Sequence, residues 1–188
     1  SLGYPAPEPE RIRQSMGGPM ASTMALFVED ERLEEAGMLF RKKFPNVMFD
    51  GLVILPGALE LVRFFGEREV PQVILTNKHG DTARLVSTHC GFDPWIHACV
   101  GNTDTEWSKP EPRLTEYALA QVGAGPEGAI LIGDSPTDVA TAQRADLTCY
   151  GVATGAHAVE ELLDAGAAEA FEDLHALRQF LDQSDYSK

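Results

Sequence analysis

Two aspartates spaced four residues apart give the clearest chemical signal in the chain. Asp134 and Asp138 lie in the segment AILIGDSPTD, residues 129–138. Its apolar residues 129–132 predict a buried strand of a parallel sheet, and the Ser-Pro-Thr after Asp134 predicts a turn into a helix. Open α/β sheets bind their ligands at the carboxyl ends of strands. Because Mg²⁺ takes carboxylate oxygens together with substrate phosphate oxygens, we expect the two aspartates to hold Mg²⁺.

A structural interpretation of the same carboxylates stays open. Asp134 also fits the N-cap of the following helix, and Asp138 fits an acidic residue in its first turn. Both positions favour a negative charge, because the backbone N–H groups at a helix N-terminus are unpaired. Taken alone, the segment allows either a metal site or a helix cap.

Two further segments place polar groups where an anion could bind. The strand expected at residues 73–75 ends in Thr76 and Asn77, whose hydroxyl and amide can bind an anionic oxygen. Lys109 stands between a serine and a proline, in a segment that fits neither the middle of a helix nor that of a strand. Ordinary roles also stay open, since Thr and Asn often satisfy local backbone and most lysines are solvated.

The order of these segments resembles the haloacid dehalogenase-like superfamily of phosphohydrolases, in the branch that includes the phosphoglycolate phosphatases. Thr76 falls on the second motif of that family and Lys109 on the third. Asp134 and Asp138 fall on the fourth, where GDSPTD is highly specific. The resemblance implies a Mg²⁺-dependent phosphatase acting on a small phosphate monoester such as phosphoglycolate. It assigns catalytic roles to Thr76 and Lys109, phosphate binding to these two and Asn77, and metal binding to the aspartates.

The first motif of the family has no counterpart before Thr76. That motif is a strand ending in D-x-D, which carries the nucleophilic aspartate and the general acid/base. Asp30 lies in an acidic helical pattern, and Asp50 has no second aspartate after it. Because the opening residues resemble the middle of a cap domain, we expect a longer protein whose upstream segment forms the aspartyl-phosphate. We expect the 188 residues alone to bind phosphate without hydrolysing it.

The missing motif also affects the expected sheet. In the family its strand lies between the strands expected here at residues 73–75 and 129–132. Without it, two strand edges would carry unpaired backbone groups, each costing about 1–3 kcal/mol when buried. Bare edges invite pairing, so recruitment of a strand from another chain is an alternative.

The pattern of polar and apolar residues changes at about residue 50. Residues 1–50 contain charged helical patterns over 7–16 and 24–44, and we assign them to the remainder of an α-helical cap domain. Residues 51–188 alternate strand and helix patterns, typical of a doubly wound parallel α/β sheet. Strands are expected at residues 73–75, 97–100, 129–132 and 148–152, and helices over 58–68, 82–92, 113–123, 139–144 and 174–183.

Three cap residues are candidate substrate contacts. Gly18 lies in the Gly-Gly-Pro-Met segment, residues 17–20, which resembles the specificity loop of the family's cap. Arg13 and Arg41 could bind a carboxylate or a second anion of a small substrate, or they could be surface charges of cap helices. We expect the cap to close over the reacting phosphate and to exclude water.

The composition disfavours several classes of partner. The chain has 15 Lys and Arg against 29 Asp and Glu, and this net charge of −14 disfavours nucleic acid and anionic membranes. No apolar run reaches the ~18 residues of a membrane span, and we expect a cytoplasmic protein. Cys90, Cys99 and Cys149 include no C-x-x-C pair and are expected to be free thiols used in packing.

Two other classes of protein share parts of this pattern. A phospho-acceptor receiver domain also combines acidic residues, a threonine and a lysine, but its acidic pair comes first along the chain. A non-catalytic relative, whose cleft or cap binds a partner, fits the absence of the first motif from these residues. The coding sequence upstream of Ser1 distinguishes the second class from a phosphatase.

Overall fold

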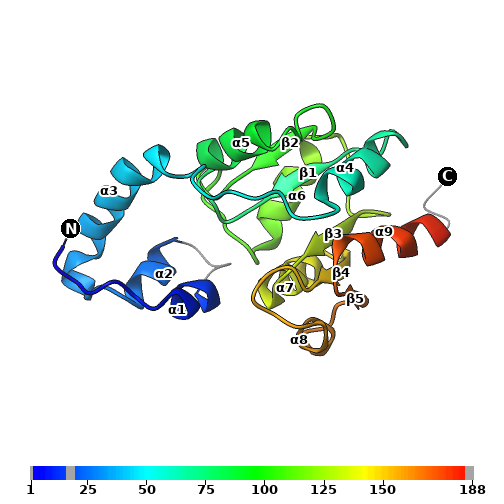
Figure 1. Ribbon diagram of the computed structural model, residues 1–188. Helices are drawn as coiled ribbons and strands as arrows, with labels where there is room; N and C mark the ends of the chain where they lie inside the picture. Colours follow the sequence, from blue (N-terminus) through cyan, green and yellow to red (C-terminus); the bar gives the residue numbers. More distant parts are fainter. Residues whose placement is uncertain (1, 16–19, 185–188) are drawn as a thin grey trace. The chain divides into compact units, whose positions relative to one another are not determined.

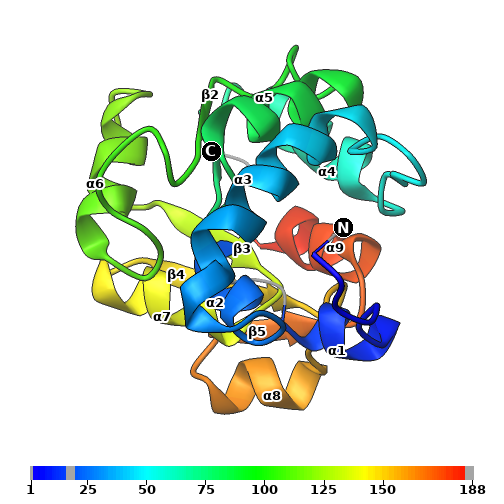
Figure 2. The same cartoon turned by 90° about the vertical axis from the view of Figure 1, so that its left-hand side faces the viewer.

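The computed structural model describes residues 2–15 and 20–184, and it divides the chain into two compact units (Figure 1). The units are Ser1–Val53 and Ile54–Lys188. The first unit is helical, and α2 packs against α3 (Figure 2). Its helices are α1 (Pro9–Gln14), α2 (Met20–Ala25) and α3 (Leu33–Lys43), with 3-10 turns at Asp30–Arg32 and Phe44–Asn46.

The helical pattern over residues 24–44 is interrupted, since α2 ends at Ala25 and α3 begins at Leu33. The chain turns after Ala25 and becomes helical again only at the 3-10 turn that precedes α3. Three bulky residues in a row, Leu-Phe-Val, cannot share one apolar stripe, and Phe27 instead lies under the guanidinium of Arg11, 5.4 Å from its ring centre. Leu26 and Met38 are consequently more than half exposed.

The second unit alternates helices and strands as the sequence predicts. Two short elements, α8 and β5, lie in an Ala-, Gly- and acid-rich region whose pattern did not predict them. The elements in chain order are α4 (Ala58–Gly66), β1 (Val73–Leu75), α5 (Gly80–His89), β2 (Ala98–Val100), α6 (Pro112–Ala120), β3 (Ile130–Gly133), α7 (Pro136–Arg144), β4 (Thr148–Val152), α8 (Val159–Asp164), β5 (Glu169–Phe171) and α9 (Leu174–Gln183).

All strand pairs of this unit are parallel, and they form two separate sheets. One sheet has the order β1-β2, with Val73 opposite Ala98, and the other has the order β3-β4-β5, with Ile130 opposite Thr148. Parallel strands joined by helices confirm the predicted α/β class. Among the described residues, β1 pairs only with β2, and β3 pairs only with β4. Each therefore has one unpaired edge, as the sequence leads us to expect.

Side chains alternate between the two faces along β3 and β4, and helices cover both faces. The residues that join α4 and α9 in one core cluster are Ile130, Ile132, Tyr150 and Val152. Leu131 and Cys149 lie on the opposite face, in the cluster formed with α7 and α8. Figure 1 shows α7 and α8 on one side of these strands and α9 on the other. The three-stranded sheet is therefore doubly wound, as predicted.

The unpaired edges are less buried than the middle of the three-stranded sheet. Each residue of β1 and of β3 is only half-buried, whereas four of the five residues of β4 are buried. Within the described part of the chain, no helix is both long enough and apolar enough to cross a membrane.

Two adjacent leucines of α8 test the packing of the core. Leu162 is fully buried between α7 and β4, whereas Leu163 is 43% exposed. Leu162→Ala is expected to lower the free energy of unfolding by about 2–5 kcal/mol, and Leu163→Ala to change it by less than about 0.5 kcal/mol. Urea unfolding measures both, and similar losses in the two variants would contradict this packing.

Candidate active site

The turn from β3 into α7 fixes Asp138 at the carboxyl edge of the sheet. Ser135 is the N-cap of α7, and its hydroxyl donates to Asp138 Oδ2 at 2.6 Å. The backbone N–H groups of Asp134 and Ser135 donate to the same oxygen, each at 3.2 Å. Asp138 is thus the N3 residue of a capping box whose N-cap is Ser135. The interpretation of Asp138 as an acidic residue in the first turn of the helix is therefore correct. The interpretation of Asp134 as the N-cap is wrong, because Ser135 is the N-cap.

Asp138 has a second partner, which comes from a distant segment. Lys109 Nζ lies 2.7 Å from Asp138 Oδ1, and the two side chains are only 11% and 9% exposed. Lys109 is therefore a buried ion-pair partner and not the solvated surface lysine that the sequence also allowed. A buried pair is worth retaining only with good geometry and further hydrogen bonds, and Asp138 has both.

Asn77 joins the end of β1 to the same lysine. The backbone N–H of Lys109 donates to Asn77 Oδ1 at 2.8 Å, and Asn77 Nδ2 donates to the Lys109 carbonyl at 3.4 Å. Thr76 precedes Asn77 and continues the pairing of β1 with β2, because its N–H donates to the Val100 carbonyl at 3.0 Å. The structure therefore brings together the three segments that the sequence singled out, through the side chains of Asn77, Lys109 and Asp138.

Asp134 joins this network only through its backbone, and its carboxylate is the one best placed for a ligand. The residue is exposed as a whole although its carboxylate is partly desolvated, and no other described residue forms an ion pair with it. Partial burial and then the negative charge of Asp138 raise the pKa of Asp134, while Lys109 and His157 oppose the shift. A bound cation would relieve the repulsion between the two carboxylates.

These residues fit a cation most of whose ligands are water molecules or substrate oxygens. No group of three or more His, Cys, Asp or Glu in the described chain is arranged to hold a metal. The Asp134 carboxylate can coordinate a metal ion directly, whereas the oxygens of Asp138 already accept hydrogen bonds from Lys109 and Ser135. Mg²⁺ commonly takes only one or two carboxylates, so Asp134 suits it as a direct ligand.

Two glycines shape the site. The position of Gly133 after the strand predicts a sharp exit of the chain, whereas nothing in the sequence pattern points to Gly155. A Cβ on Gly133 would lie 2.3 Å from the Cβ of Asp138, so only glycine lets α7 pack so closely on the end of β3. A Cβ on Gly155, in the loop after β4, would lie 2.5 Å from Asp134 Oδ2. This loop therefore covers one side of the Asp134 carboxylate.

The candidate cap residues lie in the first unit. Arg13 is exposed on α1 and forms a solvated ion pair with Glu10 at 3.4 Å. Arg41 is exposed on α3, with its guanidinium against Gly37. Gly18 lies outside the described residues. All three stay predicted substrate contacts.

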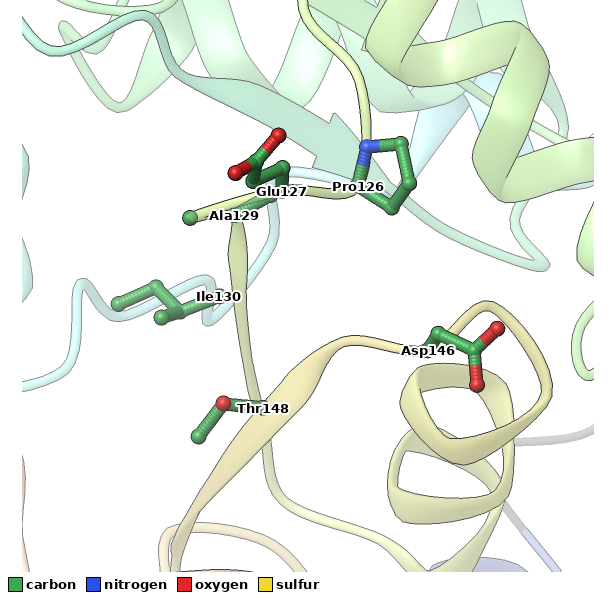
Figure 3. A pocket seen from close by; sticks show the side chains of 7 residues that line it. Pro126, Glu127, Ala129, Ile130, Asp146 and Thr148 are labelled. Atoms are coloured by element: carbon green, nitrogen blue, oxygen red, sulfur yellow. The ribbon is translucent and has the colours of Figure 1, made fainter.

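Two other features of the second unit lie outside the candidate site. A cavity of about 380 Å³ lies at the amino ends of β3 and β4, opposite Asp134 (Figure 3). It is lined by Pro126, Glu127, Gly128, Ala129, Ile130, Asp146 and Thr148. The cysteines are free, as predicted, and burial raises the pKa of Cys149 to about 12, so this thiol is inert at neutral pH.

Comparison with known proteins gives a consistent result. Residues 1–152 match the family described as haloacid dehalogenase-like hydrolase. A phosphoglycolate phosphatase of Rhodospirillum rubrum is 31% identical over 131 residues, which cover 70% of this chain. The chain spans about half, 54%, of the length of that relative. A 5'-nucleotidase of Pseudomonas aeruginosa is 29% identical, and the match covers 96% of this chain and 83% of the relative.

Solved structures show the same fold. A haloacid dehalogenase-like hydrolase from Bacteroides fragilis superimposes with a TM-score of 0.85 at 21% identity, over 93% of this chain and 85% of that one. A haloacid dehalogenase-like family protein from Streptococcus pneumoniae gives 0.83 at 22% identity, over 96% and 84% of the two chains.

Removing one partner of the buried ion pair should destabilise the fold. Lys109→Met is expected to lower the free energy of unfolding by about 3–5 kcal/mol, because it leaves the Asp138 charge unpaired. The double variant Lys109→Met/Asp138→Asn should lose less than the two single variants together. The exposed pair Arg32 and Glu35 is the control, with an expected coupling of about 0–1 kcal/mol. Equal couplings for the two pairs would contradict the assignment.

The raised pKa of Asp134 gives a pH-dependent prediction. The folded chain binds this proton more tightly than the unfolded chain, so stability falls as the pH rises through the raised pKa. Without divalent cations, Asp134→Asn should therefore raise the free energy of unfolding at pH 7, and the gain should narrow toward about pH 4. Chemical denaturation at the two pH values measures this difference. A gain that does not depend on pH would refute the stated cause.

Proposed function

Because the chain belongs to the haloacid dehalogenase-like hydrolase family, we propose that it is the larger part of a Mg²⁺-dependent phosphatase. The observation that supports this proposal most is the contact chain from Asn77 through Lys109 to Asp138. It brings the residues proposed to bind phosphate and metal to the carboxyl ends of the strands, where parallel sheets bind their ligands.

The proposed substrate is a small phosphate monoester. Relatives named as phosphoglycolate phosphatase and 5'-nucleotidase support a phosphoric monoester in general, and phosphoglycolate is the first candidate. Arg13, Gly18 and Arg41 of the first unit are proposed to contact the part of the substrate beyond the phosphate. Two arginines would suit a carboxylate or a second anionic group, since guanidinium forms paired hydrogen bonds with such groups.

Three residues are proposed to bind the phosphoryl oxygens. Thr76 supplies a hydroxyl and Asn77 a backbone N–H at the end of β1, where an anion can approach. Lys109 uses one of its three N–H donors on Asp138 at 2.7 Å, which leaves two for a phosphoryl oxygen. The ion pair thus orients the ammonium and also supplies positive charge to the site.

Asp134 is proposed as the direct ligand of Mg²⁺, with Asp138 binding either directly or through water. When bound, Mg²⁺ would offset the negative charge of the phosphoryl oxygens. Asp138 also has a second task, because it holds Lys109 and the first turn of α7 in place.

The nucleophile is proposed to come from outside residues 1–188, since these residues contain no D-x-D. The unpaired edges of β1 and β3 leave room in the pairing scheme for one parallel strand between the two sheets. A strand there would end at the same edge as Thr76 and Asp134. Its first aspartate would attack phosphorus, and its second would protonate the leaving alcohol and then activate water.

A non-catalytic binding protein is the second candidate function. The absence of D-x-D from these residues favours it. Such a protein would retain the phosphate and Mg²⁺ contacts without turnover.

Magnesium binding tests the proposed metal ligands. Mg²⁺ is expected to raise the unfolding midpoint of the chain, and Asp134→Asn should abolish that shift. Gly155→Ala should weaken Mg²⁺ binding at least about tenfold, because its Cβ would displace the Asp134 carboxylate. Gly125→Ala is the control, since a Cβ there meets nothing within 4 Å. Calorimetric titration measures the affinities, and equal affinities in the two glycine variants would contradict this placement.

Turnover tests the proposed source of the nucleophile. Residues 1–188 alone should show no phosphatase activity. The protein that includes its upstream coding sequence should hydrolyse phosphate esters with Mg²⁺, in a reaction abolished by Asp134→Asn. A screen of small phosphate monoesters, with phosphoglycolate first, measures both forms. Mg²⁺-dependent turnover by residues 1–188 that Asp134→Asn abolishes would overturn the proposed source, and an inactive longer protein would favour the non-catalytic function.

A further inference from the structure

The loop after β2 is hydrogen-bonded to the segment that follows β1. The backbone N–H of Asn102 donates to the Lys78 carbonyl at 3.0 Å, and that of Gly80 donates to Thr103 Oγ1 at 3.0 Å. A Cβ on Gly101 would lie 2.5 Å from the Lys78 carbonyl oxygen, so the two backbones touch. This contact lies directly beyond Thr76 and Asn77 along the chain.

An arginine and an aspartate hold this loop in place. Arg84 of α5 donates two parallel hydrogen bonds to Asp104, at 2.9 and 3.1 Å, and Asp104 also accepts from the Gly101 N–H at 2.8 Å. Arg84 further donates to the carbonyl of Cys99, the middle residue of β2, at 3.1 Å. The Arg84 guanidinium holds the pKa of Asp104 below its usual range, so the pair is ionised at neutral pH.

The space around Asp104 is shaped for this carboxylate. A Cβ on Gly80, the first residue of α5, would lie 2.5 Å from Asp104 Oδ1. Asp104 therefore packs against the start of the helix that follows Thr76 and Asn77. The side chain of Asp104 is 19% exposed. That of Arg84 is 44% exposed and also pairs with the exposed carboxylate of Asp81.

We propose that Arg84 and Asp104 are positioning residues for the phosphate-binding segment 76–80. The inference rests on the proposed function, because it assigns the pair a task in the phosphate site. The pair acts through the main chain of Gly101, Lys78 and Gly80. By fixing that backbone, it keeps the Thr76 hydroxyl and the Asn77 N–H in the arrangement that binds a phosphoryl group.

Geometry, more than stability, explains such a pair. A half-exposed ion pair contributes little to the free energy of folding. The paired hydrogen bonds of a planar guanidinium, in contrast, fix orientation, and lysine cannot reproduce them. Small misplacements of donors around a reacting group can cost about 100-fold in rate.

Separate titrations of two ligands test the proposal. In the full-length protein, Arg84→Lys and Asp104→Asn should each weaken the binding of inorganic phosphate by about tenfold or more. Both variants should leave the Mg²⁺ affinity unchanged, because Asp134 lies on the other sheet, and should lower the unfolding midpoint only slightly, because the pair is partly exposed. Arg178→Lys is the control, since Arg178 pairs with Asp182 in α9 at 3.9 Å. It should change none of the three quantities.

The outcomes separate this inference from the proposed function. Selective loss of phosphate binding in both variants supports the positioning role. Unchanged phosphate affinity overturns it, as does a parallel loss of phosphate binding, Mg²⁺ binding and stability, which would show general loosening. If the unaltered protein binds no phosphate, the proposed function itself fails, and the inference fails with it.

Discussion

The buried ion pair between Lys109 and Asp138 is the constraint on which the candidate site depends. It joins a loop held by the end of β1 to the first turn after β3, across two sheets that share no backbone pairing in the described chain. Burying two charges carries a large desolvation cost, which is offset only by close contact and further hydrogen bonds. The capping box at Ser135 supplies those bonds to Asp138, and the amide of Asn77 holds the backbone of Lys109. The proposed phosphate and metal residues are thereby brought together.

Local sequence predicted most of the fold and three segments that the structure brings together. The apolar run before Asp134, the short run before Thr76 and the proline after Lys109 all fix backbone conformation within a few residues. Within each sheet, parallel pairing then brings the carboxyl ends of the strands to one edge. For the same reason the α/β class followed from the alternation of patterns alone.

The remaining features depend on contacts between residues far apart in sequence. Asp138 fitted both a helix cap and a metal site, and it is a capping residue that also pairs with Lys109, a partner 29 positions away. Gly155 approaches Asp134 only because β4 returns beside β3. The helical pattern over residues 24–44 is interrupted between α2 and α3, where Phe27 lies against Arg11, a contact that a local apolar pattern does not encode. The unpaired edges of β1 and β3 agree with the expectation drawn from the missing first motif.

The central claim is that phosphate and Mg²⁺ bind to one site at this edge. Two ligands that share a site change each other's affinity by the same factor. Calorimetric titration of phosphate with and without saturating Mg²⁺ therefore tests the claim most directly. We expect Mg²⁺ to tighten phosphate binding and phosphate to tighten Mg²⁺ binding by the same factor. Asp134→Asn should remove this coupling between the two ligands. Phosphate binding that is indifferent to Mg²⁺ would contradict the claim.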